Sequence, residues 1–153
     1  MADYFFDSSA LAKAYVAETG THWVRTLLDD EQHRIYISQL AEVEVIAALT
    51  RRFSIGDLTQ QDRDQLARDA RQDCASFLVV NITAEIIEAA VDLALKYNLR
   101  AYDVVQLASA LEVRDLLVQN SQNPSILSLV SADLELNRAS ALEGVQVDDP
   151  NFH

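Results

Sequence analysis

Cysteine, histidine and long apolar runs are all scarce in this sequence of 153 residues. The single cysteine, Cys74, cannot form an internal disulfide, and it has no Cys or His neighbours at the spacing of a zinc site. No apolar run approaches the roughly 20 residues that a bilayer-spanning helix needs. The start, Met-Ala-Asp-Tyr, lacks the basic region of a secretory signal. We therefore expect a cytoplasmic protein that makes no contact with a membrane.

Basic residues are also few. The chain has 12 Lys and Arg against 24 Asp and Glu, which gives a net charge of −12. Affinity for a nucleic-acid backbone comes mainly from Lys and Arg, so this composition suits a basic partner better than unaided binding of nucleic acid. Hydrophobic residues make up 50% of the chain, which is enough for a sizeable core. We expect one domain spanning residues 1–153.

The motifs of several common enzyme classes are missing. The sequence has neither the G-x-x-x-x-G-K-S/T loop of nucleoside-triphosphate sites nor the G-x-G-x-x-G loop of dinucleotide sites. His22, His33 and His153 are scattered along the chain and do not predict a Ser-His-Asp triad. We expect surface or structural roles for all three.

Short apolar strands alternate with helices along the chain. The sequence predicts strands at 4–6, 34–38, 77–80, 126–130 and 145–147, and helices at 10–18, 21–31, 39–53, 59–76, 83–97, 134–141 and from 98 to a polar break at 119–125. Because the strands are continuously apolar rather than alternating, they fit a parallel sheet that is covered on both faces. The predicted fold class is an α/β three-layer sandwich.

Four acidic residues stand in mainly apolar surroundings near the ends of these elements. Asp7 follows the first strand directly, and Asp133 lies three residues beyond the fourth. Asp103 is in the first turn of an apolar helix, and Glu44 lies roughly a turn and a half inside its own helix. Sites in open parallel sheets form beyond the carboxyl ends of the strands, so we expect the four acids to meet at that edge.

Four convergent carboxylates call for a divalent cation. Hard oxygen ligands favour Mg²⁺ or Mn²⁺ over zinc. One ion, or two about 3.5–4 Å apart, would polarise a phosphoryl oxygen and deprotonate a water. Without metal the carboxylates would repel one another, and at least one would take up a proton. The pattern therefore predicts a metal site suited to phosphoryl chemistry.

Each acid also has a simpler explanation. Asp7, Asp103 and Asp133 stand at or near helix starts, where Asp is favoured as a cap. Glu44 lies too far inside its helix to cap it. Glu42, two residues earlier in the same helix, is about as plausible an ordinary surface acid. The two glutamates point in nearly opposite directions, and each has apolar residues on its own face. Periodicity alone therefore does not choose between them.

Four segments, taken in order, resemble the motifs of the PIN-domain family, and in particular the toxins of VapBC toxin–antitoxin pairs. The segments are Tyr4–Leu11, Ser38–Leu49, Leu99–Ala110 and Leu129–Leu136, which contribute Asp7, Glu44, Asp103 and Asp133. In the second motif the acid comes six residues after the serine, which selects Glu44. Each motif is short, but all four occur in order at suitable separations, and the match runs nearly from end to end.

This resemblance implies both a fold and an activity. The fold is a parallel sheet of strand order 3-2-1-4-5. The activity is that of a Mg²⁺- or Mn²⁺-dependent endoribonuclease, in which the four acids are the metal ligands and catalytic residues. The resemblance also implies RNA as the substrate, a homodimer, and a cognate antitoxin protein that blocks the site.

Further polar residues lie close to these motifs. Ser9 and Ser131 match positions that often support the acids or metal waters, and helix capping explains them equally well. Asn137 stands where some members carry another ligand, but an amide would bind metal only weakly, so we leave it out of the core site. Five basic residues are candidates for RNA phosphate contacts, with a solvated surface role as the ordinary explanation for each: Lys13, Arg51, Arg52, Arg100 and Arg138.

Two other functions deserve comparison. The strong negative charge also fits a PIN-like interaction module that binds a protein partner and cuts little or no RNA. A receiver-type signalling domain would need paired acids after the first strand and a lysine after a late strand. The chain instead has Asp7-Ser8-Ser9 and Ser131-Ala132-Asp133 at these places, which argues against a receiver.

Overall fold

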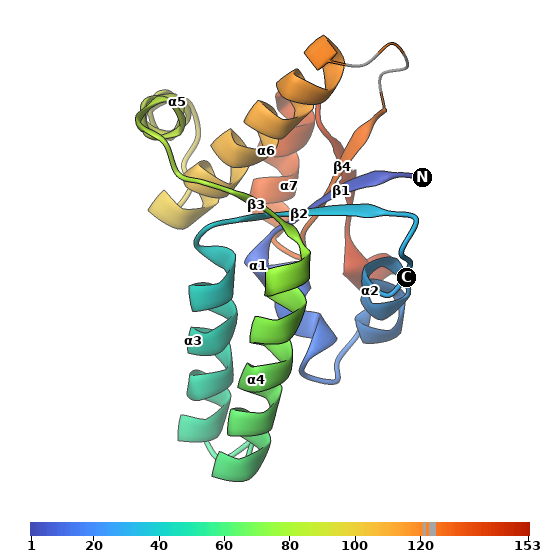
Figure 1. Ribbon diagram of the computed structural model, residues 1–153. Coiled ribbons are helices and arrows are strands. Elements are labelled where there is room, and N and C mark those ends of the chain that lie inside the picture. The colour runs from blue at the N-terminus through green and yellow to red at the C-terminus, as the bar shows by residue number, and fades with distance from the viewer. Residues whose placement is uncertain (121, 123–124) are drawn as a thin grey trace.

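Five short parallel strands form the centre of the fold (Figure 1). The structure is a computed structural model, and it describes residues 1–120, 122 and 125–153. The strands are β1 (Asp3–Phe6), β2 (Arg34–Ser38), β3 (Leu78–Val80), β4 (Leu127–Val130) and β5 (Gln146–Asp148). Their order in the sheet is β3-β2-β1-β4-β5, and every neighbouring pair is parallel. The structure thus confirms the predicted fold class and strand order.

Helices cover both faces of this sheet. They are α1 (Ser8–Leu11), the 3₁₀ helix η1 (Ala12–Ala14), α2 (Thr21–Leu28), α3 (Ala41–Ser54), α4 (Gln60–Ser76), α5 (Ala84–Lys96), α6 (Ala101–Asn120), α7 (Leu134–Leu142) and the 3₁₀ helix η2 (Pro150–Phe152). Helices α3 and α4 pack against each other and extend well beyond the sheet (Figure 1). No helix in the described ranges is both long and apolar enough to cross a membrane.

Adjacent residues of the central strands pack into different cores. Phe6 and Val130 belong to the core formed with α1 to α4, whereas Phe5 and Leu129 belong to the core formed with α5 to α7. Successive side chains of a strand point to opposite faces, so a strand that is buried on both faces needs an unbroken apolar sequence. This double burial explains why the strands lack the alternation of a half-exposed sheet.

Two predicted helices are shorter in the structure than in the prediction. The helix expected at 10–18 starts earlier, at Ser8, and its last turn is 3₁₀ and ends at Ala14. The chain then turns through Gly20, whose φ of +86° suits glycine, and a Cβ there would lie 2.3 Å from the carbonyl oxygen of Pro150. The helix expected at 21–31 ends at Leu28.

The remaining differences are small. Helix α6 continues into the polar break predicted at 119–125, as far as Asn120. The part of that break at residues 121, 123 and 124 lies outside the described residues. The final 3₁₀ helix η2 was not predicted.

The amino-terminal edge of the sheet carries an ion pair between buried Asp3 and partly exposed Arg34. The Asp3 side chain is fully buried, and its two oxygens accept hydrogen bonds from Nε and Nη2 of Arg34 at 2.6 and 2.8 Å. Ser125 also donates to Asp3. The buried Asp3 carboxylate needs this partner, because an unpaired charge would be costly to bury, whereas the Arg34 side chain is 42% exposed. The pair therefore joins the first residues of β1 and β2 at the edge away from the predicted site.

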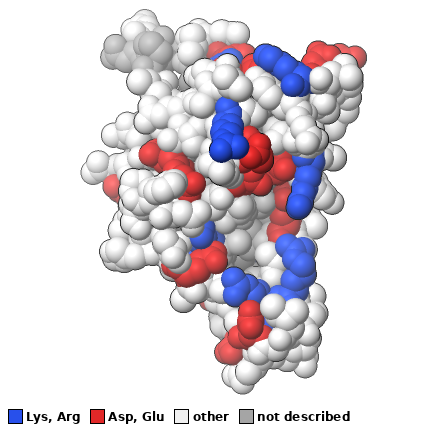
Figure 2. Space-filling view, turned by 180° about the vertical axis from the view of Figure 1, so that it is seen from behind, with Lys and Arg blue, Asp and Glu red and all other residues white. Residues whose placement is uncertain are grey.

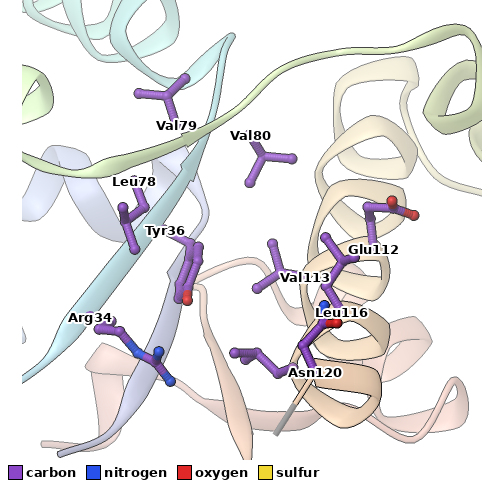
Figure 3. A pocket seen from close by; sticks show the side chains of 10 residues that line it. Arg34, Tyr36, Leu78, Val79, Val80, Glu112, Val113, Leu116 and Asn120 are labelled. Carbon is purple, nitrogen blue, oxygen red and sulfur yellow. The ribbon is translucent and has the colours of Figure 1, made fainter.

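A separate, mostly apolar pocket lies between the sheet edge and α6 (Figure 3). Its volume is about 450 Å³. Tyr36 and Val80 line it from the sheet, and Val113 and Leu116 line it from α6. None of the four predicted site acids lines this pocket.

Candidate functional site

Asp7 occupies the turn that follows β1. Its backbone N–H donates to the carbonyl of Val130 at 3.0 Å, so the residue is fixed beside the end of β4. The Asp7 side chain is buried, and Ser9 and Ser131 both donate to its Oδ2, the latter at 3.2 Å. The backbone N–H of Ser9 donates to the same oxygen at 3.3 Å, so Asp7 is the N-cap of α1.

The two serines also join the β1 and β4 turns to each other. Ser9 Oγ accepts from the backbone N–H of Ala132, and Ser131 Oγ accepts from that of Asp133, both at 3.1 Å. Each hydroxyl therefore holds a turn and a carboxylate at the same time. The supporting and the capping roles considered for these serines are both present in their hydrogen bonds.

Glu44 faces Asp7, whereas Glu42 does not. Ser8 Oγ donates to Glu44 Oε2 at 2.8 Å, and Gln106 Nε2 donates to Glu44 Oε1 at 2.9 Å. Glu42 instead accepts from Arg71 Nε at 2.8 Å, across the contact between α3 and α4. The packing of α3 against α1, together with the hydrogen bond from Gln106 of α6, thus turns Glu44 rather than Glu42 toward Asp7.

Asp133 and Asp103 stand at the starts of α7 and α6. Asp133 Oδ1 accepts from the backbone N–H of Leu136 at 2.9 Å and caps α7. Asp103 lies in the first turn of α6, where the backbone and the charge of Arg100 lower its pKa. Both side chains are half-buried. The structure therefore makes Asp7 and Asp133 N-caps and places Asp103 in the first turn of its helix, as the simpler explanation described.

The electrostatics indicate that the four acids share one neighbourhood. The pKa of Asp103 is raised to about 6, mainly by burial and in addition by the negative charges of Asp133 and Asp7. Burial also raises the pKa of Asp7, with a smaller contribution from Glu44, while the hydrogen bonds from Ser9 and Ser131 lower it. Because these like charges lie close together at a partly buried edge of the sheet, protonation of an acid or binding of a cation is favoured over four free carboxylates.

The donor chemistry of this edge fits a hard divalent cation. Asp7, Glu44, Asp103 and Asp133 offer only carboxylate oxygens, the ligands that Mg²⁺ and Mn²⁺ prefer. Among the described residues, however, no three His, Cys, Asp or Glu side chains are close enough together to bind one metal ion as they stand. The hydrogen bonds to Ser8, Ser9, Ser131 and Gln106 hold the carboxylates in place instead.

Sequence reasoning gave no role to Ser8 or Gln106. Gln106 is fully buried in α6, and its Oε1 has no hydrogen-bond partner among the described residues. A polar amide in an otherwise apolar helix was the available signal for it. Asn137, which was left out of the core site, is buried in α7 and donates to the Ser131 carbonyl at 2.9 Å. Its Oδ1 likewise lacks a partner within the described residues.

Comparisons with known proteins agree with this architecture. The PIN domain family model matches residues 4–141. Ribonuclease VapC45 from Mycobacterium tuberculosis is 37% identical over 111 residues, which cover 72% of this chain and 76% of the relative.

Solved structures share the fold at lower identity. A toxin–antitoxin complex from Klebsiella pneumoniae aligns with a TM-score of 0.63 at 20% identity, covering 96% of this chain and 97% of that one. The protein PAE2754 from Pyrobaculum aerophilum aligns with a TM-score of 0.64 at 21% identity, covering 95% and 83%. The family model and the curated relative together show that this chain belongs to the PIN domain family.

Proposed function

We propose that this protein is an endoribonuclease that depends on Mg²⁺ or Mn²⁺ and acts as the toxin of a VapBC toxin–antitoxin pair. The observation that carries the proposal is the set of Asp7, Glu44, Asp103 and Asp133 at the carboxyl edge of the sheet, where their charges affect one another. The name of the curated relative, a ribonuclease VapC, supports the same activity.

In this proposal the four acids hold one or two divalent ions. When bound, such an ion supplies positive charge for the phosphate and makes a water more acidic. Ser9 and Ser131 fix Oδ2 of Asp7 and so leave its other oxygen for the ion. Ser8 and Gln106 hold Glu44 in one orientation. The chain thus positions its ligands before the substrate arrives, which is how supporting residues aid a metal site.

The proposal includes three further properties. The protein works in the cytoplasm, pairs with a second copy of itself, and is blocked by a cognate antitoxin protein. The complexes among its structural neighbours, such as the one from Klebsiella pneumoniae, support the antitoxin. A net charge of −12 suits an antitoxin with a basic segment.

A PIN-fold interaction module that does not cut RNA is the second candidate. It is favoured by the excess of acid and by the carboxylates being held in hydrogen bonds rather than gathered around one point. It predicts a tight protein complex without divalent-metal binding at the acids.

Cleavage assays separate the two candidates. Purified protein is incubated with structured RNAs, tRNAs included, in Mg²⁺, Mn²⁺ or EDTA. We expect cutting that requires metal and is lost in Asp103→Asn and Glu44→Gln. The loss in each should exceed the about 10- to 100-fold typical of residues that only support a metal ligand.

Glu42→Gln is the matched control. It makes the same chemical change in the same helix, at a side chain that faces Arg71 rather than Asp7, and it should cut like the wild type. Wild-type activity in Glu44→Gln, or activity that persists in EDTA, would show that the site is wrongly assigned. Neither cutting nor Mn²⁺ binding would favour the interaction module.

A further inference from the structure

A groove of about 470 Å³ opens directly beside the proposed site. One wall is a single face of α3, and the other is the beginning of α6. The lining residues are Leu40, Val43, Glu44, Ala47, Arg51, Arg100, Tyr102 and Asp103. Glu44 and Asp103 are proposed metal ligands, so whatever lies in this groove also meets the site.

The groove contains cations that are unusual for this molecule. Nine of the twelve Lys and Arg side chains have a carboxylate within 4.0 Å. Among the described residues, the three without such a partner are Arg51, Arg68 and Arg100. Two of these three line the groove. With 24 acids available, the presence of two arginines without an ion pair at one place points to an anionic ligand there.

Arg100 lies close to the proposed metal ligands, whereas Arg51 lies farther along the groove. Arg100 immediately precedes the α6 helix that carries Asp103, and its charge lowers the pKa of that residue. Arg51 lies seven residues beyond Glu44 on α3, or about 10 Å along the helix axis. The pair therefore suits a ligand with several separated anionic groups rather than one phosphate. Figure 2 shows Lys and Arg side chains lying close to Asp and Glu side chains on one face of the molecule.

Apolar surface between these charges suits a flat ring. The Tyr102 side chain is 57% exposed and Val43 is 66% exposed, and both line the groove. An exposed aromatic residue next to arginine is the arrangement on which unpaired bases stack.

We propose that this groove binds single-stranded RNA next to the bond that is cut. Arg51 and Arg100 each contact a backbone phosphate, and Tyr102 stacks on a base. The inference rests on the proposed ribonuclease function and adds the residues that position its substrate. It also explains how a chain with a net charge of −12 holds RNA, because the attraction is local to two side chains.

Steady-state cleavage kinetics of Arg51→Gln and Arg100→Gln test the phosphate contacts. Loss of one charge-assisted hydrogen bond should raise KM for RNA about tenfold. In Arg51→Gln, kcat should stay within about twofold, since this residue is far from Asp103. Arg68→Gln is the matched control, because Arg68 lacks an ion-pair partner too but lies on α4 outside the groove. It should leave both constants unchanged.

Tyr102 variants test the stacking contact. Tyr102→Ala should raise KM at least about fivefold, whereas Tyr102→Phe should restore the wild-type value because the ring alone is needed. Equal melting temperatures would show that these exposed positions alter binding and not folding. The inference is overturned if the groove variants match Arg68→Gln, or if only kcat falls.

A binding measurement keeps this inference separate from the activity. If the wild type does not cut RNA, a labelled single-stranded RNA is titrated against the full-length protein. Binding that is lost in the Arg51→Gln/Arg100→Gln double variant would retain the groove and reject only the nuclease. The RNA groove would be rejected if the wild type did not bind the RNA. It would also be rejected if the double variant still bound RNA and lost only the binding of an acidic protein tested in parallel.

Discussion

Capping and metal binding are compatible at the aspartates of this site. The hydrogen bonds that Asp7 accepts from Ser9 and Ser131 end on Oδ2, and Asp133 caps α7 through Oδ1. Each carboxylate has a second oxygen, and each oxygen has two lone pairs. An N-cap therefore fixes the direction of the side chain without exhausting its capacity to bind. The two explanations that the sequence allowed describe different atoms of the same group.

The raised pKa of Asp103 gives a pH-dependent prediction. An acid whose pKa rises from 3.8 to about 6 on folding costs stability when it is ionised. That cost is fully present above pH 6 and disappears as the pH falls toward 4, because the folded state then binds the extra proton. Without metal, Asp103→Asn should therefore have a higher melting temperature than the wild type at pH 8. Denaturation in EDTA measures this difference.

The same comparison at low pH is the internal control. At pH 4.5 most of the wild-type Asp103 is protonated. The melting temperature of Asp103→Asn should therefore exceed that of the wild type by much less than at pH 8. Mg²⁺ at pH 8 should stabilise the wild type and leave Asp103→Asn much less affected. A variant that is less stable than the wild type at pH 8 would contradict the raised pKa.

The sequence pointed to the acids of the candidate site more readily than to the residues that hold them in place. Asp7 and Asp133 were predictable because they follow strands, and the carboxyl ends of parallel strands share an edge. Glu44 was separated from Glu42 only by resemblance, since the choice depends on how α3 packs against α1 and on the hydrogen bond from Gln106 of α6. Gln106 was missed because a buried amide is recognisable only once its partner across the core is known.

At the scale of elements, strands were predicted more closely than helix ends. Strand β2 has the predicted bounds, because it is a short apolar run with polar neighbours. The first helix was predicted to run past Tyr15, whose apolar neighbours continue the helical spacing. Instead the helical turn ends at Ala14, and Lys13 donates to the Thr19 carbonyl of the following loop at 3.0 Å. Such a contact with a loop leaves no periodic signal.

Helix α5 offers a direct test of a capping contact away from the site. Thr83 Oγ1 accepts from the backbone N–H of Ile86 at 3.2 Å, an N–H group that has no carbonyl partner within the helix. Thr83→Ala should lower the free energy of unfolding by about 1 kcal/mol, or the melting temperature by roughly 2–4 °C. Thermal or urea unfolding followed by circular dichroism measures the change.

Thr50 provides the control for this substitution. It is exposed inside α3, where alanine has the higher helix propensity, so Thr50→Ala should be neutral or slightly stabilising. If the two variants changed stability equally, the effect would come from the loss of a threonine and not from the loss of a cap.

At the scale of the whole molecule, net charge limits how RNA can bind. With 24 acids and 12 basic residues, the chain repels a polyanion at a distance, and salt screens this repulsion over about 10 Å at 0.1 M. Nine of the basic side chains are already paired with carboxylates. Attraction must therefore come from a few local contacts rather than from a broad basic surface.

This limit predicts a shallow dependence of RNA binding on salt. Two phosphate contacts, from Arg51 and Arg100, release counterions with a slope near −1.4 on a log–log plot, or about a sevenfold loss of affinity between 50 and 200 mM salt. The relief of long-range repulsion would make the slope shallower still. Binding of single-stranded RNA to the cleavage-deficient Asp7→Asn variant in Mg²⁺ measures it, with the Arg51→Gln/Arg100→Gln changes added as control. A slope steeper than about −4 would require six or more phosphate contacts, and hence a basic surface that the paired side chains of this molecule do not offer.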